Sequence, residues 1–287
     1  FHTQYYQPSN VIVAVVGQFD REEILEEIVR IYSDENNMPV ERNSPPQESP
    51  QAGLRYDWER GPITEAQVAI GYHVPGLDGV ASDVYALKVL SAILTGGRAS
   101  RMNWFLRDEQ GSITSAVSSY LALKGLGYFI LRLGGSDPSA AQIDAFGELD
   151  RIRRFGVDGE SLARAKILVA QDYYQRLETV RDIADELALA EANGDWKRLD
   201  FFLDGIQAGR RDDIQVVVNK YFDRDNLTVF EYLPESMPRT QSTAEYEANV
   251  LDQVPLNIVE RSIGELEVSA QVELIDNELV VDVIQPF

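Results

Sequence analysis

Residues 98–119, RASRMNWFLRDEQGSITSAVSS, decide the fold expected for this chain. The apolar residues in the first half recur at helical spacing and predict a helix packed on a core: Met102, Phe105 and Leu106. Gly111 favours a reversal of the chain, and the residues after it predict a strand. The stretch therefore predicts a helix that runs directly into a sheet, with Arg107 at the helix end, where a cation is favourable. We expect Arg98 and Arg101 to anchor the loop or to pair with acidic neighbours.

The segments around this stretch extend the pattern. In chain order we expect a strand over 66–76, a helix over 83–95 with a left-handed cap at Gly96–Gly97, a hairpin over 119–133 that turns at 124–127, a strand over 127–135, helices over 139–155, 159–177, 179–193, 196–208 and 211–222, and a strand over 226–233. This order lacks a regular βαβ alternation. It predicts an α+β fold in which a mainly antiparallel sheet of four or more strands packs against a layer of helices.

The two ends of the chain predict further units. Val11 to Val16 reads as a strand buried on both faces, and Asp20 as the N-cap of a helix whose apolar stripe is Ile24, Leu25, Ile28 and Ile31. Residues 235–257 read as an exposed acidic linker, and the chain after them as two or three strands with a turn at Asp276–Asn277. The predicted domains are 1–35 (the C-terminal end of a first domain), 36–54 (a proline-rich linker), 55–234 (a complete second domain) and 235–287 (an acidic linker and the start of a following segment).

An internal similarity supports this division. Residues 5–16 and 221–232 align at an offset of 216 positions (221 minus 5), and each has an aromatic pair, a turn, an Asn and a β-branched strand. A unit of that length then occurs twice, with most of the first copy upstream of Phe1.

Composition limits the class of partner. The chain has 26 Lys and Arg against 47 Asp and Glu, a net charge of −21. This balance argues against binding to nucleic acid or to anionic membrane surfaces, because no surplus of cations exists to neutralise phosphates. It is compatible with basic or extended polypeptide partners. The sequence contains no run of 18 apolar residues and therefore predicts no membrane span.

The sequence contains no complete catalytic motif. Cysteine is absent, and the two histidines, His2 and His73, lack the spacing of a zinc site. No Gly-x-Ser-x-Gly elbow or phosphate-binding loop occurs, and the glycine pairs 96–97 and 134–135 read as turns. We therefore assign no catalytic residue and no metal ligand, and His73 reads as a strand-end residue.

Four segments follow one another as in the pitrilysin/insulinase-type metallopeptidases, the inverzincins: residues 5–20, 90–119, 160–196 and 219–234. The chain resembles the part of that family that follows the zinc-binding region. The resemblance implies a metallopeptidase-like (mitochondrial-processing-peptidase-like) domain that pairs with a similar domain as a clamshell. The segment around Asp195 and Trp196 resembles bacterial members with two consecutive modules, which implies a periplasmic or otherwise exported location.

The resemblance also implies roles for two residues. In the family, the first domain holds zinc through His-x-x-Glu-His and a downstream Glu, and the second supplies an Arg and a Tyr that hold the substrate backbone. Arg107 occupies the position of that Arg, where a guanidinium can donate in a fork to peptide carbonyls. The Tyr position is Thr114, whose shorter side chain departs from the family pattern. Any zinc ligands lie upstream of Phe1, so this chain alone is predicted to bind no zinc and to cleave no peptide.

Two functions remain open at this stage. The chain is either the substrate-holding, non-zinc-binding portion of a zinc metalloendopeptidase or a non-catalytic homologue that acts as a structural or substrate-presenting subunit of a peptidase-like heterodimer. Thr114 favours the second function. In both cases the expected partners are a peptide or protein substrate and an upstream domain of the same protein or a homologous subunit.

Overall fold

A five-stranded sheet forms the centre of the molecule. The computed structural model describes residues 2–33, 40, 51–237, 241–255, 258, 269–275 and 278–284. The strand order is β1-β5-β2-β4-β3. The strands are β1 (Arg55–Gly61), β2 (Ala66–Val74), β3 (Ser115–Leu123), β4 (Leu126–Gly135) and β5 (Leu227–Pro234). β1 lies parallel to β5 and the other pairs in this sheet are antiparallel, so the expected mainly antiparallel sheet is confirmed. The expected elements do not include β1.

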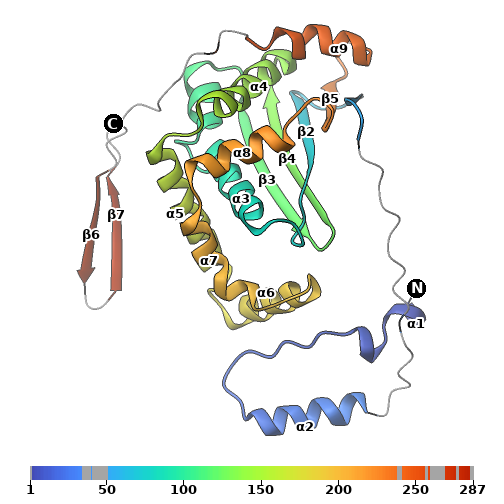
Figure 1. The fold of residues 1–287 in the computed structure, drawn as a ribbon, viewed down its shortest axis with the longest axis vertical. Helices are drawn as coiled ribbons and strands as arrows, with labels where there is room; N and C mark the ends of the chain where they lie inside the picture. Colours follow the sequence, from blue (N-terminus) through green and yellow to red (C-terminus); the bar gives the residue numbers. More distant parts are fainter. Residues whose placement is uncertain are drawn as a thin grey trace.

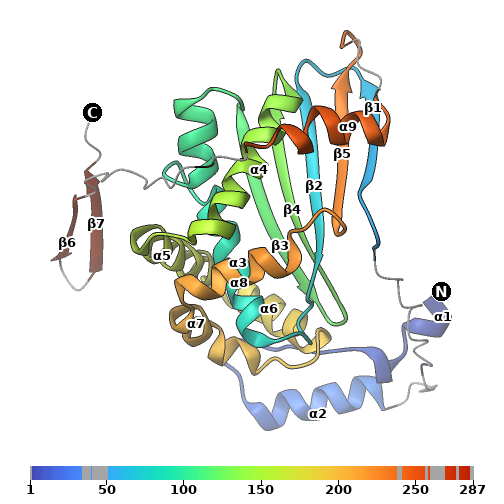
Figure 2. The ribbon, with the colours of Figure 1, turned by 45° about the horizontal axis from the view of Figure 1, so that its top comes forward.

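Helices cover one face of this sheet, and the opposite face, here called the open face, carries none of the helices that the structure describes (Figure 1, Figure 2). The inner layer that contacts the strands is α3 (Ala81–Thr95), α4 (Pro138–Phe155) and α8 (Arg211–Tyr221). The outer helices are α5 (Gly159–Gln175), α6 (Val180–Ala192) and α7 (Arg198–Ala208). On β2, Val68 and Ile70 point into the helical layer and are buried, whereas Gln67 and His73 are exposed on the open face. The α+β two-layer prediction is confirmed.

Local sequence signals place the helix starts. Asp137 caps α4 by accepting hydrogen bonds from the backbone N–H groups of Ser139 and Ala140. Thr179 caps α6 in the same way, because its hydroxyl accepts a hydrogen bond from the backbone N–H of Asp182. Such caps satisfy N–H groups that have no partner inside the helix. The five helices α4 to α8 begin and end close to their predicted positions.

The N-terminal region corrects one expectation. It contains α1 (His2–Tyr5), the 3₁₀ helix η1 (Pro8–Asn10) and α2 (Arg21–Tyr32), which Asp20 caps as predicted. Residues 11–16 form no helix and pair with no strand in the part of the chain that the structure describes, and Val11 and Val13 are each 46% exposed. The predicted burial on both faces is wrong because burial of a strand requires neighbouring strands. The apolar stripe of α2 is likewise not buried.

The segment after β5 corrects the expectation of an exposed linker. Residues 241–255 are not an exposed linker: they include α9 (Thr243–Asn249) and the 3₁₀ helix η3 (Leu251–Gln253), and Tyr246 and Val250 are fully buried. The Tyr246 ring stacks on Tyr56 of β1 at a centroid distance of 4.3 Å. Its hydroxyl donates to Oε1 of Gln142, whose Nε2 in turn donates to the buried Glu231 carboxylate at 2.7 Å. A satisfied buried polar network therefore fastens α9 to the domain.

The remaining expectations concern the C-terminal strands and the linker. β6 (Ser269–Ile275) and β7 (Glu278–Ile284) form an antiparallel pair, as expected. The turn expected at Asp276–Asn277 and most of the linker 36–54 lie outside the described residues. Among the helices that the structure describes, none is long and apolar enough to cross a membrane.

We expect Tyr246→Ala to lower the free energy of unfolding by roughly 3–5 kcal/mol, because it removes a fully buried ring. Tyr246→Phe keeps the ring and should lose about 1–3 kcal/mol, since Gln142 then lacks a hydrogen-bond partner for its oxygen. The matched control is Tyr174→Ala, because Tyr174 is 63% exposed. Urea unfolding of the three variants measures these differences. Equal stability of Tyr246→Ala and the control would contradict the packing of α9.

Candidate functional site

The helix of the stretch 98–119 is a π-helix, η2 (Met102–Glu109). Its wider turn is seen in the hydrogen bond from the N–H of Gln110 to the carbonyl of Phe105, five residues earlier. π-helical segments are rare and often lie at functional sites. The predicted core residues are confirmed, since Met102 and Leu106 are fully buried and Phe105 is nearly so.

Asn103 connects η2 to the preceding helix. Its buried amide donates to the carbonyls of Thr95 and Gly97, each at 3.1 Å. The bond to Thr95 satisfies a carbonyl at the end of α3 that has no helical partner, and the bond to Gly97 holds the loop that follows the helix. Gly97 adopts a φ of 75°, whereas Gly96 stays at a φ of −70°. The left-handed residue of the predicted cap is therefore Gly97.

Arg101 anchors the start of η2 in the helical layer. Its guanidinium contacts Glu148 of α4 at 3.6 Å and Asp158, the N-cap of α5, at 3.2 Å. Burial raises the pKa of the Asp158 carboxyl, but hydrogen bonds from Ser161 and the charge of Arg101 outweigh it and hold that pKa below its ordinary value. The prediction that Arg101 pairs with acidic residues is confirmed. These contacts fix the start of η2, and Arg107 lies at the opposite end of the same helix.

Arg107, the first candidate for substrate binding, lies in the last turn of η2 with its side chain 32% exposed. Its Nε donates to Asp108 at 2.8 Å, and Arg98 contacts the same carboxylate at 3.4 Å. The hydrogen bond from Arg107 is the main reason that the pKa of Asp108 lies below its ordinary value. Gly111 follows at a φ of 68°, and the chain then reverses into β3. The predicted strand near Ser112 begins at Ser115.

Thr114, the second candidate, lies at the start of this strand. Its backbone N–H donates to the carbonyl of Gly134, and its hydroxyl donates to Glu65 at 2.5 Å. A Cβ at Gly134 would lie 3.3 Å from the Thr114 hydroxyl and 2.6 Å from that of Ser115. Gly134 and Gly135 are thus positions of close approach within β4, and the expectation that they form a turn is wrong. No hydrogen bond joins the two candidates, and each one is held by a carboxylate.

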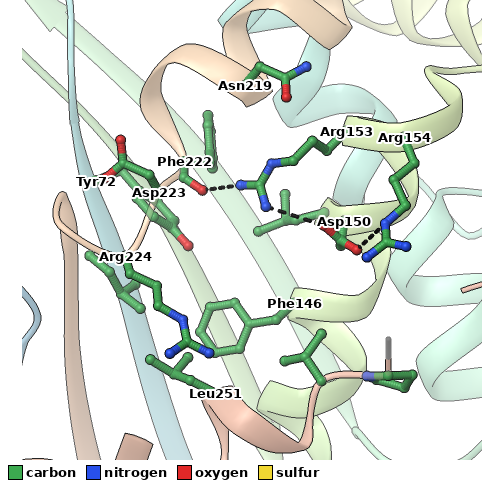
Figure 3. Close-up of a pocket in the computed structure, with 14 residues that line it drawn as sticks. Tyr72, Phe146, Asp150, Arg153, Arg154, Asn219, Phe222, Asp223, Arg224 and Leu251 are labelled. Atoms are coloured by element: carbon green, nitrogen blue, oxygen red, sulfur yellow. Dashed lines mark hydrogen bonds and ion pairs between the residues drawn. The ribbon is translucent and has the colours of Figure 1, made fainter. Parts of the chain in front are cut away.

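A pocket of about 490 Å³ lies on the helical side of the sheet, between α4, α8 and the segment that follows α9. Figure 3 shows the guanidinium groups of Arg153 and Arg154 pointing toward the Asp150 carboxylate, and that of Arg153 also toward the carbonyl of Phe222. Arg153 contacts Asp150 at 3.2 Å, and Arg154 contacts the same carboxylate at 2.7 Å. Arg224 pairs with Asp252 at 3.0 Å. The charges in this pocket are therefore compensated within the chain, and the pocket does not contact Arg107 or Thr114.

A second pocket, of about 530 Å³, lies at the end of β2 beside His73. Asn226 donates to the carbonyl of His73 and accepts from its N–H, so the prediction of a strand-end residue is confirmed. Asp78 and Asp223 line this pocket, but each accepts a backbone hydrogen bond in a turn. No group of three or more acidic or histidine side chains within the described ranges is placed to hold a metal ion. The absence of zinc from the chain remains a prediction.

Sequence reasoning found Arg107 and Thr114 but missed two neighbours. Glu65 is 49 positions from Thr114 in the sequence, and no local pattern connects them. Arg132 lies on β4 between Leu131 and Leu133, both buried, and faces the open side of the sheet. Arg132 is the single charged residue in an otherwise uncharged strand, and this pattern could have identified it.

The chain is similar to proteins of one known family. Residues 1–169 match the family model described as the peptidase M16 inactive domain. The chain is 26% identical over 246 residues to the zinc protease PqqE of Helicobacter pylori, covering 80% of this chain and 53% of that protein. The chain spans about half the length of the curated relatives it matches.

Solved structures show the same fold. A protease from Helicobacter pylori superposes with a TM-score of 0.74 at 25% identity, over 81% of this chain and 57% of that one. The inactive peptidase domain of a putative zinc protease from Bordetella parapertussis superposes with a TM-score of 0.53 at 21% identity, over 63% of this chain and 97% of that one.

We expect Gly111→Ala to lower the free energy of unfolding by about 1–2 kcal/mol, because a Cβ is disfavoured at this positive φ even without a clash. The matched control is Gly147→Ala inside α4, where a methyl group meets nothing within 4 Å. That variant should gain roughly 0.5–1 kcal/mol of helix stability. Thermal or urea unfolding compares the two. A stabilising effect of Gly111→Ala would contradict the left-handed turn that joins η2 to β3.

Proposed function

The chain belongs to the peptidase M16 family, as its inactive domain, and from this premise we propose that it holds the polypeptide substrate of a zinc endopeptidase. The match to an inactive-domain model supports a role as the non-catalytic, non-zinc-binding portion of a peptidase-like protein. In the proposed protein, the zinc ligands and the water that attacks the peptide belong to a catalytic domain outside this chain.

The position of Arg107 carries this proposal. A partly exposed guanidinium at the end of an anchored helix can donate in a fork to the carbonyls of an extended peptide, which supports the proposal. Its present partner is the adjacent, partly exposed Asp108. Surface pairs of this kind contribute little to stability, so exchange of Asp108 for a substrate carbonyl is easily reached.

The edge of the sheet supplies the second element. β3 is the last strand in the order, and its outer edge pairs with no strand among the described elements. An extended peptide can add to such an edge through main-chain hydrogen bonds, and its side chains then alternate between the two faces. Because η2 leads into β3 through Gly111, Arg107 lies at the beginning of this edge.

The N-terminal region supports a partner domain. Residues 11–16 and α2 expose apolar side chains, among them Leu25 and Val29, which are 56% and 57% exposed. A preceding peptidase domain of the same protein, or a homologous subunit, would cover these surfaces and supply the zinc site. We further propose an exported location such as the periplasm, on the resemblance of the segment near Trp196 to bacterial members of the family.

Thr114 supports a second candidate function. A threonine replaces the family's tyrosine, and its hydroxyl is engaged with Glu65. Loss of one of two substrate-holding groups fits a homologue that presents substrate or supports a partner without assisting catalysis. His-x-x-Glu-His in the region that precedes Phe1 would favour the first function, and its absence the second.

For the full-length protein we expect Arg107→Ala to weaken the binding of an extended peptide by roughly 10- to 100-fold, because a charge-assisted pair of hydrogen bonds is lost. Arg107→Lys should lose part of this affinity, since an ammonium group has no planar fork. Thr114→Tyr should tighten binding. Isothermal titration calorimetry measures each affinity.

The control for these variants is Arg181→Ala on α6, whose side chain is 88% exposed and pairs with the exposed Asp185 of the same helix. It should bind the peptide like wild type. If Arg107→Ala and the control bind alike, Arg107 is a solvated residue at a helix end and holds no substrate.

A further inference from the structure

Cross-strand registers place five side chains in one row on the open face of the sheet. In order from β1 to β3 they are Asp57, Phe230, Ala69, Arg132 and Val117. Neighbours in such a row lie about 5 Å apart. Arg132 is therefore roughly 15 Å from Asp57, which lies at the β1 end of the row. Its immediate neighbours, Ala69 and Val117, are both apolar.

Arg132 is the only permanently charged side chain on the open face of β5, β2, β4 and β3, within the residues that the structure describes. The other side chains there are uncharged, apart from the titratable His73. The edge strand β1, by contrast, carries charges on this face, among them Asp57 and Glu59. In a chain of net charge −21, this surface is therefore nearly neutral with one cation at its centre.

Arg132 also differs from the arginines discussed above. Arg101, Arg107 and Arg224 each pair with a carboxylate. Arg132 is exposed, and none of the ion pairs between described residues includes it. Glu65, on the same side of the sheet, is engaged by Thr114. The charge of Arg132 is thus available to a ligand.

The surroundings of Arg132 define what such a ligand looks like. Val117 is 56% exposed and Phe230 is 39% exposed in the same row, and Tyr128 is 38% exposed further along β4. Exposed apolar groups of this size favour apolar side chains beside the ion pair. They also reduce hydration around the guanidinium, which strengthens a short-range pair relative to one in open water.

The open face continues into the proposed substrate site. The Thr114 hydroxyl lies over Gly134, and Gly134 is two residues from Arg132 on the same face of β4, a distance of about 7 Å. We propose that Arg132 binds the carboxylate of an acidic side chain in an extended polypeptide substrate, with apolar residues on either side of that acid. This inference rests on the proposed substrate-holding function and adds a preference in substrate sequence to it.

The test measures binding of matched peptides to the full-length protein by calorimetry. The probes are acetyl-Ala-Val-Leu-Xaa-Val-Leu-Ala-amide with Glu, Gln or Lys at Xaa, so that the side chain is the only charged group. A fourth peptide has Gln at Xaa and a free C-terminal carboxylate. Wild type should bind the Glu peptide roughly tenfold more tightly than the Gln peptide, and the Lys peptide most weakly.

The variants separate a specific pair from a general effect. Arg132→Gln should bring the Glu:Gln affinity ratio to about one, and Arg132→Glu should reverse the preference toward Lys. Arg181→Gln, the matched exposed arginine on α6, should keep the wild-type ratio. Arg107→Ala should weaken all the peptides by a similar factor and leave the ratio unchanged, because it contacts the backbone.

Several results would overturn the inference. An unchanged Glu:Gln ratio in Arg132→Gln, or no preference in wild type, excludes recognition of an acidic side chain by Arg132 but leaves the substrate-holding function intact. Equal affinity for the Glu peptide and for the Gln peptide with a free C-terminus assigns Arg132 to chain ends instead. Failure of wild type to bind any of the peptides contradicts both this inference and the proposed function.

Discussion

A guanidinium that is buried in a protein needs carboxylates close to it, and this requirement determines how the helical layer is assembled around Arg101. Its side chain is only 6% exposed and lies between Glu148 of α4 and Asp158 at the start of α5. Arg151 pairs with the same Glu148, so charges alternate across the junction. Removal of one partner from such a cluster leaves an uncompensated charge, which is far more costly than the loss of an exposed pair. The position of η2, and with it Arg107, depends on residues that lie about 50 positions further along the chain.

Periodicity and turn residues predicted most of the second domain because its helices and strands each carry their own signal. The missing elements are those whose signal depends on distant residues. β1 alternates charged residues with Tyr56, which packs against α9, and Trp58, and this edge strand resembles a polar loop in sequence. The acidic composition around α9 suggested a linker, whereas the contact between Tyr246 and Gln142, 104 positions apart, orders that segment. Residues 11–16 show the converse, since β-branched composition cannot supply the neighbouring strands that would bury them.

The candidate site was accessible from the sequence only in part. Arg107 and Thr114 followed from a resemblance to a family and from their spacing around Gly111. The role of Gly134 could not be inferred from a glycine pair, because it depends on how closely the Ser115 and Thr114 hydroxyls approach β4. The isolation of Arg132 on the open face required the strand register, since a shift of one residue would turn its side chain into the core. The sequence therefore indicated which residues contribute to the candidate site, but it did not indicate how they are arranged in space.

The place of β5 in the sheet has a consequence for how the domain is made. β5 lies between β1 and β2, yet it is the last strand of this sheet to leave the ribosome. At about 5–20 residues per second, β1 waits on the order of ten seconds or longer for its partner. During that interval β2 and β4 can pair with each other, but the edge of β2 that β5 will occupy remains open to other chains. Long-range pairing of this kind also slows folding. During synthesis of this domain, a chaperone or a neighbouring domain would therefore be most needed to shield the unpaired edge of β2 from other chains.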